Sequence, residues 1–144
     1  MMTTLRIEGA DRDVLMQASK NGFFYVLDRG TGALLAADKF VDVNWASGVD
    51  LKSGRPLENP EADYTQGKPV IVFPSAVGAH NFNPMSLSGK TGLVYIPAVH
   101  SGMALVEKPV SPYEPQRNAT GVQVALATQL LQPTGDAAAG TGGR

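Results

Sequence analysis

Residues 23–37 read Phe-Phe-Tyr-Val-Leu-Asp-Arg-Gly-Thr-Gly-Ala-Leu-Leu-Ala-Ala, and this stretch decides the fold class. Its first five residues form an uninterrupted aromatic and aliphatic run, which favours a strand. Because the run is apolar on both faces, it predicts a strand buried between two layers. The small polar residues 28–32 predict a turn, and residues 33–37 return as the partner strand. The stretch therefore predicts an antiparallel hairpin.

Short β-prone runs continue on both sides of this hairpin. The glycines, 16 of 144 residues, fall mostly between these runs, and the pair Asn21-Gly22 is a favoured turn pair in which both residues tolerate positive φ. This pattern predicts an all-β chain with many tight turns and almost no helix. The further strands are expected at residues 5–8, 13–18, 40–45, 69–74, 85–88, 93–97 and 103–106.

The chain divides into three regions by composition. Residues 1–110 hold the strand pattern, although Ser-Gly pairs and prolines after residue 45 predict a long ordered connection to residue 69, with a turn at 50–56. Residues 111–134 are interpreted as an irregular extension; within it, residues 122–131 fit both a strand and one helical face, and we favour strand or irregular structure. Residues 135–144 are almost wholly Gly, Ala and Thr and are expected to be disordered.

Charge and composition exclude several classes of protein. Twelve basic residues against thirteen acidic ones leave no footprint for nucleic acid. The absence of cysteine excludes disulfide scaffolds, zinc knuckles, iron–sulfur sites and thiol catalysis for this chain. No apolar run is long enough for a transmembrane segment, and no secretory signal is visible at the first residues.

Two hairpin patterns resemble each other: residues 25–35 and residues 87–95 both have a strand, a small polar turn ending in Thr-Gly, and a second strand. Thr31 and Thr91 lie roughly 60 residues apart, which is longer than a WD40 blade of about 40–45 residues and nearer the roughly 50 of kelch repeats. The repetition suggests propeller blades. The alternative is that Thr-Gly is simply a common hairpin turn, and spacing does not decide between the two.

The sequence contains no recognisable metal-binding or catalytic motif. His80 and His100 have no metal-ligand spacing around them, and a lone histidine is more often structural. Glu58, Glu61 and Asp63 fit a solvated surface loop rather than a catalytic pair. Two features are unusual: a lysine, Lys20, stands just before the apolar strand, and residues 78–85 form a polar and aromatic cluster that is suited to a flat ligand.

Four stretches together resemble the quinoprotein alcohol dehydrogenases that use pyrroloquinoline quinone. They are Lys-Asn-Gly-Phe-Phe-Tyr-Val-Leu-Asp-Arg at 20–29, Val-Asn-Trp-Ala-Ser-Gly-Val-Asp at 43–50, the segment 72–86 that contains Gly-Ala-His-Asn-Phe-Asn-Pro-Met-Ser, and Thr-Gly-Leu-Val-Tyr-Ile-Pro at 91–97. The resemblance runs in order from about residue 6 to residue 108.

This resemblance implies a fold and an activity. The family folds as an eight-bladed β-propeller with four-stranded blades, and pyrroloquinoline quinone lies beside a calcium ion in its central funnel. The chain would then be a partial β-propeller of about two blades from an enzyme that oxidises alcohols, passes electrons to the quinone, and works in the periplasm. The family's catalytic base, calcium ligands and adjacent-cysteine disulfide all precede the matched region. The resemblance therefore assigns no catalytic and no metal-binding residue to this chain.

Three residues match cofactor-binding positions of the family. Lys20 matches the lysine that hydrogen-bonds the reactive carbonyl region of the quinone, where an ammonium stabilises developing negative charge. Asn81 matches an asparagine at the cofactor's rim. Phe82 stands where the family usually has tryptophan, so the flat face is kept and an indole N–H donor is lost.

The alternative reading is a non-catalytic β-propeller-derived module that binds a partner or has a structural role. In either reading the chain alone is expected to be inactive, because it carries one part of a closed assembly. Its expected partners are an alcohol, the rest of the propeller, or further copies of itself. Association would involve blade faces bearing Phe23, Tyr25, Ile71 and Tyr95.

Overall fold

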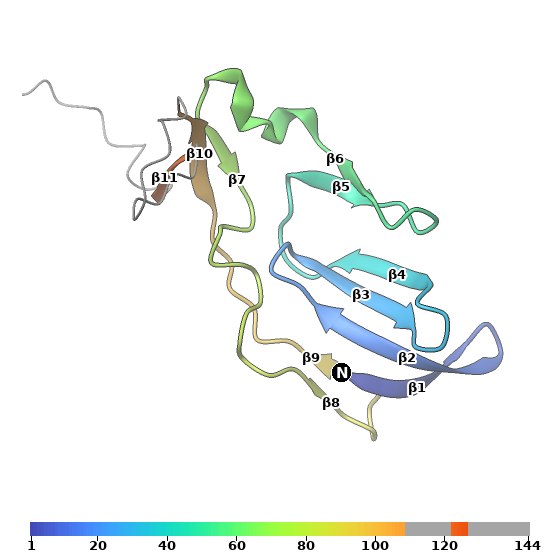
Figure 1. Ribbon diagram of the computed structural model, residues 1–144. Coiled ribbons are helices and arrows are strands. Elements are labelled where there is room, and N and C mark those ends of the chain that lie inside the picture. The colour runs from blue at the N-terminus through green and yellow to red at the C-terminus, as the bar shows by residue number, and fades with distance from the viewer. Residues whose placement is uncertain (109–121, 127–144) are drawn as a thin grey trace, which may run out of the picture.

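The first and most complete unit of the fold is a four-stranded antiparallel sheet (Figure 1). In this computed structural model, which describes residues 1–108 and 122–126, its strands follow one another in the order β1-β2-β3-β4. Such a meander has the architecture of one propeller blade. The strands are β1 (Met2–Ile7), β2 (Ala10–Ala18), β3 (Phe23–Asp28) and β4 (Leu34–Lys39).

β2 is an inner strand of this sheet, and its side chains alternate between a buried and an exposed face. Val14, Met16 and Ala18 all point to one face and are buried, while Asp13 and Gln17 between and beside them are exposed. β2 pairs with β1 on one side and with β3 on the other. The predicted hairpin of residues 23–37 is confirmed as the β3–β4 pair.

The burial of β3 differs from the prediction. Only Phe23 is fully buried, at 1% exposure, and the rest of the strand is half-buried. Phe23 packs against Val43 and Ala46, whereas the described residues provide no comparable second layer over the remainder of the strand. The expectation of a strand enclosed by two layers is therefore wrong here, and so is the expectation that Phe23 lies on an exposed blade face.

Three smaller sheets follow the first one. β10 lies between β7 and β11, and all the pairings are antiparallel. The second predicted hairpin is confirmed as the short pair β8–β9. These sheets consist of β5 (Ala46–Val49) with β6 (Pro56–Glu58), β7 (Val70–Val72) with β10 (Met103–Glu107) and β11 (Val122–Leu126), and β8 (Ser86–Leu87) with β9 (Val94–Tyr95).

Residues 40–45 do not form the predicted strand. Their backbone donors bond to separate segments instead of to one neighbouring strand: Phe40 N–H donates to Gly22 O at 3.1 Å, and Asn44 N–H donates to Phe73 O at 3.3 Å. The Asn44 amide adds bonds to β7 and its end, donating to Ile71 O and accepting from Phe73 N–H, each at 2.8 Å. The segment is a connector that ties the first sheet to β7.

The long connection predicted up to residue 69 contains more structure than expected. The β5–β6 hairpin occupies its first part, with the predicted turn at 50–56 between the strands. Two short 3-10 helices, Pro60–Ala62 and Tyr64–Gln66, follow it, and the side chains of Asn59 and Asp63 cap their N-termini. Among the described residues there is no α-helix, and no helix is long and apolar enough to cross a membrane.

Three hairpin turns share one geometry. Each turn spans six residues: the N–H of the first residue donates to the carbonyl of the sixth, as from Asp28 to Ala33. The fifth residue of each turn is a glycine with φ near +70°. The first side chain, Asp or Ser, accepts backbone N–H bonds within the turn. The turns are Asp28–Ala33, Asp50–Arg55 and Ser88–Leu93. The Thr-Gly similarity is thus a similarity of structure, with a third copy, Ser53-Gly54, that the sequence reading missed.

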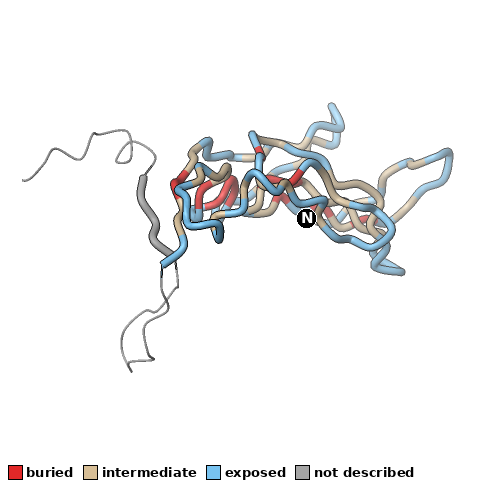
Figure 2. Tube along the Cα trace, turned by 90° about the horizontal axis from the view of Figure 1, so that it is seen from above, coloured by how far each residue is buried: buried red, intermediate tan, exposed pale blue. Residues whose placement is uncertain are grey.

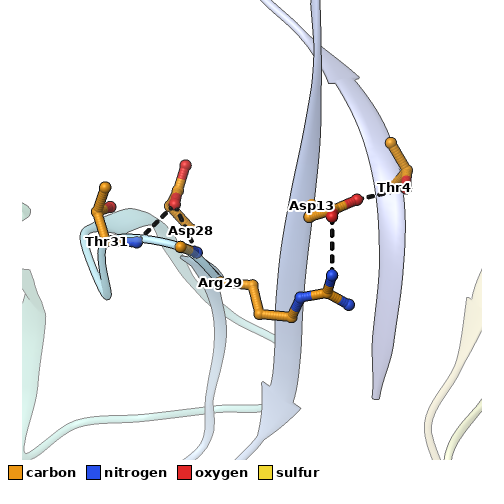
Figure 3. Close-up of polar contacts among 6 residues, drawn as sticks. Thr4, Asp13, Asp28, Arg29 and Thr31 are labelled. Atoms are coloured by element: carbon orange, nitrogen blue, oxygen red, sulfur yellow. Dashed lines mark hydrogen bonds and ion pairs between the residues drawn. The ribbon is translucent and has the colours of Figure 1, made fainter.

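Side chains around the first of these turns link three strands, as Figure 3 shows. The Asp28 carboxylate accepts from the N–H groups of Gly30 and Thr31, both at 2.9 Å. Arg29 points the other way and pairs with Asp13 on β2 at 2.8 Å, and Asp13 also accepts from Thr4 on β1. Both ions of the Arg29–Asp13 pair are about half exposed, so its contribution to stability is small.

The described part of the chain forms a thin layer. Figure 2 shows its few buried residues along the middle, between half-buried and exposed ones. Two of the residues expected on exposed faces are exposed, Ile71 at 41% and Tyr95 at 53%, while Tyr25 is half-buried. Residues 122–126 form a strand, which agrees with the favoured reading. The rest of the predicted extension (111–121 and 127–134) and the predicted tail (135–144) lie outside the described residues.

Candidate functional site

Lys20 lies in the turn that joins β2 to β3. Gly22 N–H donates to Ser19 O at 3.2 Å, and Gly22 has φ +92°. A type I turn followed by a left-handed glycine is a common three-residue hairpin connection. The Asn21-Gly22 turn is therefore confirmed, but only the glycine takes a positive φ. The Lys20 side chain is exposed, and it forms no ion pair within residues 1–108.

Remote parts of the chain fix the backbone of this turn. All four successive carbonyl groups from Ser19 to Gly22 accept a hydrogen bond, and three of the donors come from outside the turn. A turn held at every carbonyl has little freedom to shift, so the fold sets the position of the Lys20 backbone and the direction in which its side chain leaves the turn. The donors, in order, are Gly22 N–H, Ala79 N–H (2.9 Å), Trp45 Nε1–H (3.0 Å) and Phe40 N–H (3.1 Å).

The side chains of Asn21 and Trp45 connect the turn to the aromatic residues of β3. The Asn21 side chain accepts from Phe23 N–H at 3.1 Å and donates to the Tyr25 hydroxyl at 2.7 Å. The Trp45 ring meets Phe23 edge-on, with centroids 5.9 Å apart. The aromatic core and the turn are therefore one connected structure.

The segment with Asn81 crosses over the same turn. Ser75 begins it with two bonds to Ser101, N–H to carbonyl at 2.8 Å and hydroxyl to hydroxyl at 2.7 Å. Gly78, Ala79 and His80 are buried, and Ala79 N–H donates to the Lys20 carbonyl. We call residues 75–82 the strap. The bond between Ala79 and Lys20 brings two regions together that are far apart in the sequence.

His80 has a structural position in the strap. The residue is only 5% exposed, and its Nδ1 lies 2.9 Å from the carbonyl oxygen of Pro97. A carbonyl only accepts, so Nδ1 carries the proton and donates it. His100 is exposed; its Nε2 lies 2.7 Å from an Asp42 carboxylate oxygen, and its ring is 5.7 Å from that of Phe73. Neither histidine belongs to a group of three or more potential metal ligands among the described residues.

Asn81 and Phe82 form the end of the strap and project outward. The Asn81 amide donates to Val77 O at 3.2 Å, and Asn81 is exposed. Phe82 is 87% exposed, which is a large fraction for an aromatic side chain. The structure thus places the strap that carries Asn81 and Phe82 against the turn of Lys20. It records no hydrogen bond between the side chains of Lys20 and Asn81.

A shallow hollow of about 370 Å³ lies beside the turn. Its surface is mostly apolar, and among the described residues that line it Lys20 is the charged one. Apolar walls with one or two polar groups are typical of small-molecule sites. The lining residues include Lys20, Asn21, Trp45, Pro74, Met103 and Leu105.

Sequence reasoning missed the residues that hold this arrangement. Trp45 fixes the turn through its indole N–H, and Gly78 and Ala79 bring the strap to Lys20, whereas the sequence pattern assigned none of the three a role of its own. The only signal in the sequence was Gly78 itself, which lies between two apolar strand segments, since an isolated glycine often marks a close backbone approach.

Comparisons with known proteins agree on one family. No family model matches the chain. It is 54% identical over 96 residues to quinohemoprotein alcohol dehydrogenase ADH IIB of Pseudomonas putida, which covers 67% of this chain and 14% of the relative. The solved structure of quinohemoprotein alcohol dehydrogenase ADH-IIG from Pseudomonas putida HK5 superposes with a TM-score of 0.79 and 41% identity, over 88% of this chain and 19% of that one. A europium-containing methanol dehydrogenase superposes with a TM-score of 0.77 at 33% identity, covering 85% and 21%.

The class follows from fold and comparison together: the sheets are part of a β-propeller of the quinone-dependent dehydrogenase type. The chain belongs to the quinoprotein alcohol dehydrogenase family, which is a family of oxidoreductases. It spans between about a seventh and a fifth of the length of these relatives.

Proposed function

We propose that this chain supplies one wall of the cofactor site of an alcohol dehydrogenase that uses pyrroloquinoline quinone and calcium. The quinone, when bound, accepts the electrons that an alcohol loses as it is oxidised. The observation that carries the proposal is the bond between Ala79 N–H and Lys20 O, because it joins the matched stretches 20–29 and 72–86, which hold the residues expected to contact the cofactor. The family's usual location makes the periplasm our proposed compartment.

Lys20 suits the role of binding an electron-rich oxygen. Its ammonium is exposed and takes part in no ion pair with the other described residues. Its backbone is held by the strap and by the neighbours of the turn. A fixed cation stabilises negative charge on a nearby oxygen without having to reorganise first. Lys20 would thus hold the quinone oxygen on which charge develops.

Asn81 and Phe82 suit the edge and the face of a flat ligand. The Asn81 amide donates one hydrogen to Val77 O, and within the described part of the chain its carbonyl oxygen and second hydrogen have no further bond, so they would suit a ligand. The exposed ring of Phe82 offers an apolar plane for stacking. The catalytic base and the calcium ligands are proposed to come from parts of the enzyme that precede the matched region in relatives.

The test is a substitution in a complete enzyme. Residues 6–108 replace the matching segment of a quinohemoprotein alcohol dehydrogenase, and Lys20→Ala is compared with Lys90→Ala, an exposed lysine of the Ser88–Leu93 turn. Lys20→Ala is expected to lower kcat by roughly 100-fold or more, and to weaken quinone affinity far less, because the charge matters most as the quinone is reduced. Unchanged turnover at saturating quinone would overturn the assignment of Lys20.

A further inference from the structure

Gly78 approaches the side-chain stem of Lys20 closely. This residue has φ +92°, and its Cα faces the lysine: an added Cβ would lie 2.6 Å from Lys20 Cγ, 2.8 Å from Cβ and 3.1 Å from Cα. The first distance involves a flexible stem, but the other two involve atoms that no side-chain rotation removes. Only glycine permits this approach.

The same point of the chain carries the bond between strap and turn. The Ala79 N–H that follows Gly78 donates to Lys20 O at 2.9 Å. Gly78 is buried, and its own N–H donates to Ser75 O at 2.8 Å, so the strap is tightly folded where it meets the lysine. A side chain at position 78 would have to push the strap away from the turn, and the Ala79 bond would lengthen.

We propose that Gly78 is a positioning residue for Lys20. It lets the strap form a wall along the first carbons of the lysine stem, and this wall directs the ammonium while the Ala79 bond holds the backbone. Gly78 acts through Lys20 and touches no ligand itself. The proposal deepens the function proposed above and rests on it for its catalytic consequence, but the placement of the lysine can be measured independently.

The first test uses the unsubstituted full chain and needs no cofactor. Nuclear Overhauser cross-peaks are expected between the α-protons of Gly78 and the β- and γ-protons of Lys20, because a Cβ built on Gly78 would lie only 2.6 Å from Lys20 Cγ and 2.8 Å from Lys20 Cβ, and the α-proton in its place points at the same carbons. The Ala79 amide is expected to exchange slowly with solvent. Absence of these cross-peaks in a folded chain would overturn the proposal.

The second test compares Gly78→Ala with Gly92→Ala in the full chain. Gly92 has φ +70° and open space around it, so its substitution has a similar backbone cost without a clash. With ¹³C-methylated lysines, Gly78→Ala is expected to shift the Lys20 signal and leave those of Lys52 and Lys90 unchanged, and Gly92→Ala to leave Lys20 unchanged. A Lys20 signal that moves equally in both variants, or in neither, would contradict the proposal.

The third test is a double-mutant cycle in the complete enzyme described above. Gly78→Ala is expected to lower kcat between about 10-fold and 100-fold, the scale of a displacement of about 1 Å at a reacting group. On a Lys20→Ala background it is expected to add almost nothing. If Lys20→Ala itself has no effect on kcat, the proposed function fails. The nuclear Overhauser and ¹³C-methyl measurements still decide whether Gly78 positions the Lys20 side chain. Full additivity of the two substitutions would show that Gly78 does not act through Lys20.

Discussion

Trp45 shows at the residue scale how one side chain supports a site that it does not form. Its indole Nε1–H donates to Asn21 O, the carbonyl next to that of Lys20, and its ring packs on the buried Phe23. The tryptophan therefore connects the aromatic cluster of the first sheet directly to the turn. A phenylalanine at this position would retain much of the packing and lose the donor.

We expect Trp45→Phe to lower the free energy of unfolding by about 1–3 kcal/mol, because a partly buried carbonyl loses its partner and the smaller ring packs less well. Urea unfolding monitored by circular dichroism measures the difference. Tyr95→Phe is the matched control, since it removes a polar group from an exposed ring. An equal loss in the two variants would mean that the indole bond contributes nothing to stability.

The resemblance of the sequence stretches pointed to Lys20 and Asn81, but it did not show that the strap that carries Asn81 contacts the turn of Lys20. The joining bond runs from the backbone of Ala79 to the backbone of Lys20, and backbone groups are the same in every residue type. The close approach of Gly78 likewise depends on where two loops lie in space. Only an unexplained glycine hinted at it, and glycine alone has many explanations.

At the scale of the elements, the hairpins were predictable and the connector was not. Residues 23–37 carry a long apolar strand, a polar turn and a returning strand, so local pattern and structure agree. Residues 40–45 have equally strand-like composition, but their hydrogen bonds go to the Gly22 turn and to Phe73. Contacts with segments remote in the sequence determine these hydrogen-bond partners, and a local sequence pattern contains no information about such contacts.

Two of the three equivalent turns are capped by an aspartate, and these two make the stability of their hairpins sensitive to acid. Backbone N–H bonds, from Thr31 above all, hold the pKa of Asp28 below its usual range, and the N–H of Lys52 together with the Ser53 hydroxyl does the same for the pKa of Asp50. A lowered pKa in the folded state means that the ionised carboxylates stabilise the fold above the ordinary aspartate pKa. This stabilisation is lost as the pH falls from about 4 through the lower folded-state values.

The variant Asp28→Asn/Asp50→Asn tests this directly, because asparagine keeps an acceptor oxygen and removes the charge. We expect the melting temperature of the variant to lie below that of the unsubstituted chain at pH 6, and the difference to shrink below about pH 4. The Ser88–Leu93 turn is capped by a hydroxyl that does not ionise, so this turn is expected to add nothing to the pH dependence. A difference that stays constant from pH 6 to pH 2 would contradict the explanation.

At the scale of the whole molecule, the described sheets form a thin layer (Figure 2). Several large apolar side chains of the described residues are exposed. Ile71 and Tyr95 lie on this surface, and β1 has an open edge in the first sheet. In a closed propeller such edges and faces are protected by the ring of blades. We expect the chain alone to associate with itself.

Sedimentation velocity at several concentrations measures this association. The unsubstituted chain is expected to show species larger than a monomer, and the variant Ile71→Thr/Tyr95→Ser is expected to shift the distribution toward the monomer, because both changes reduce exposed apolar area. Lys52→Ser, on an exposed turn, is the control and is expected to leave the distribution unchanged. Identical distributions for all three chains would show that these two side chains do not mediate association.

The central claim is that residues 6–108 supply one wall of a quinone site that needs the other blades to function. Alcohol-dependent reduction of an artificial electron acceptor, with pyrroloquinoline quinone and calcium supplied, measures it most directly. The chain alone is expected to show no such reduction, because it lacks the rest of the site, whereas a complete quinohemoprotein alcohol dehydrogenase that carries residues 6–108 in place of its own segment is expected to oxidise alcohol. Clear dye reduction by the monomeric chain would contradict the claim, and so would a folded, quinone-binding chimera that does not oxidise alcohol.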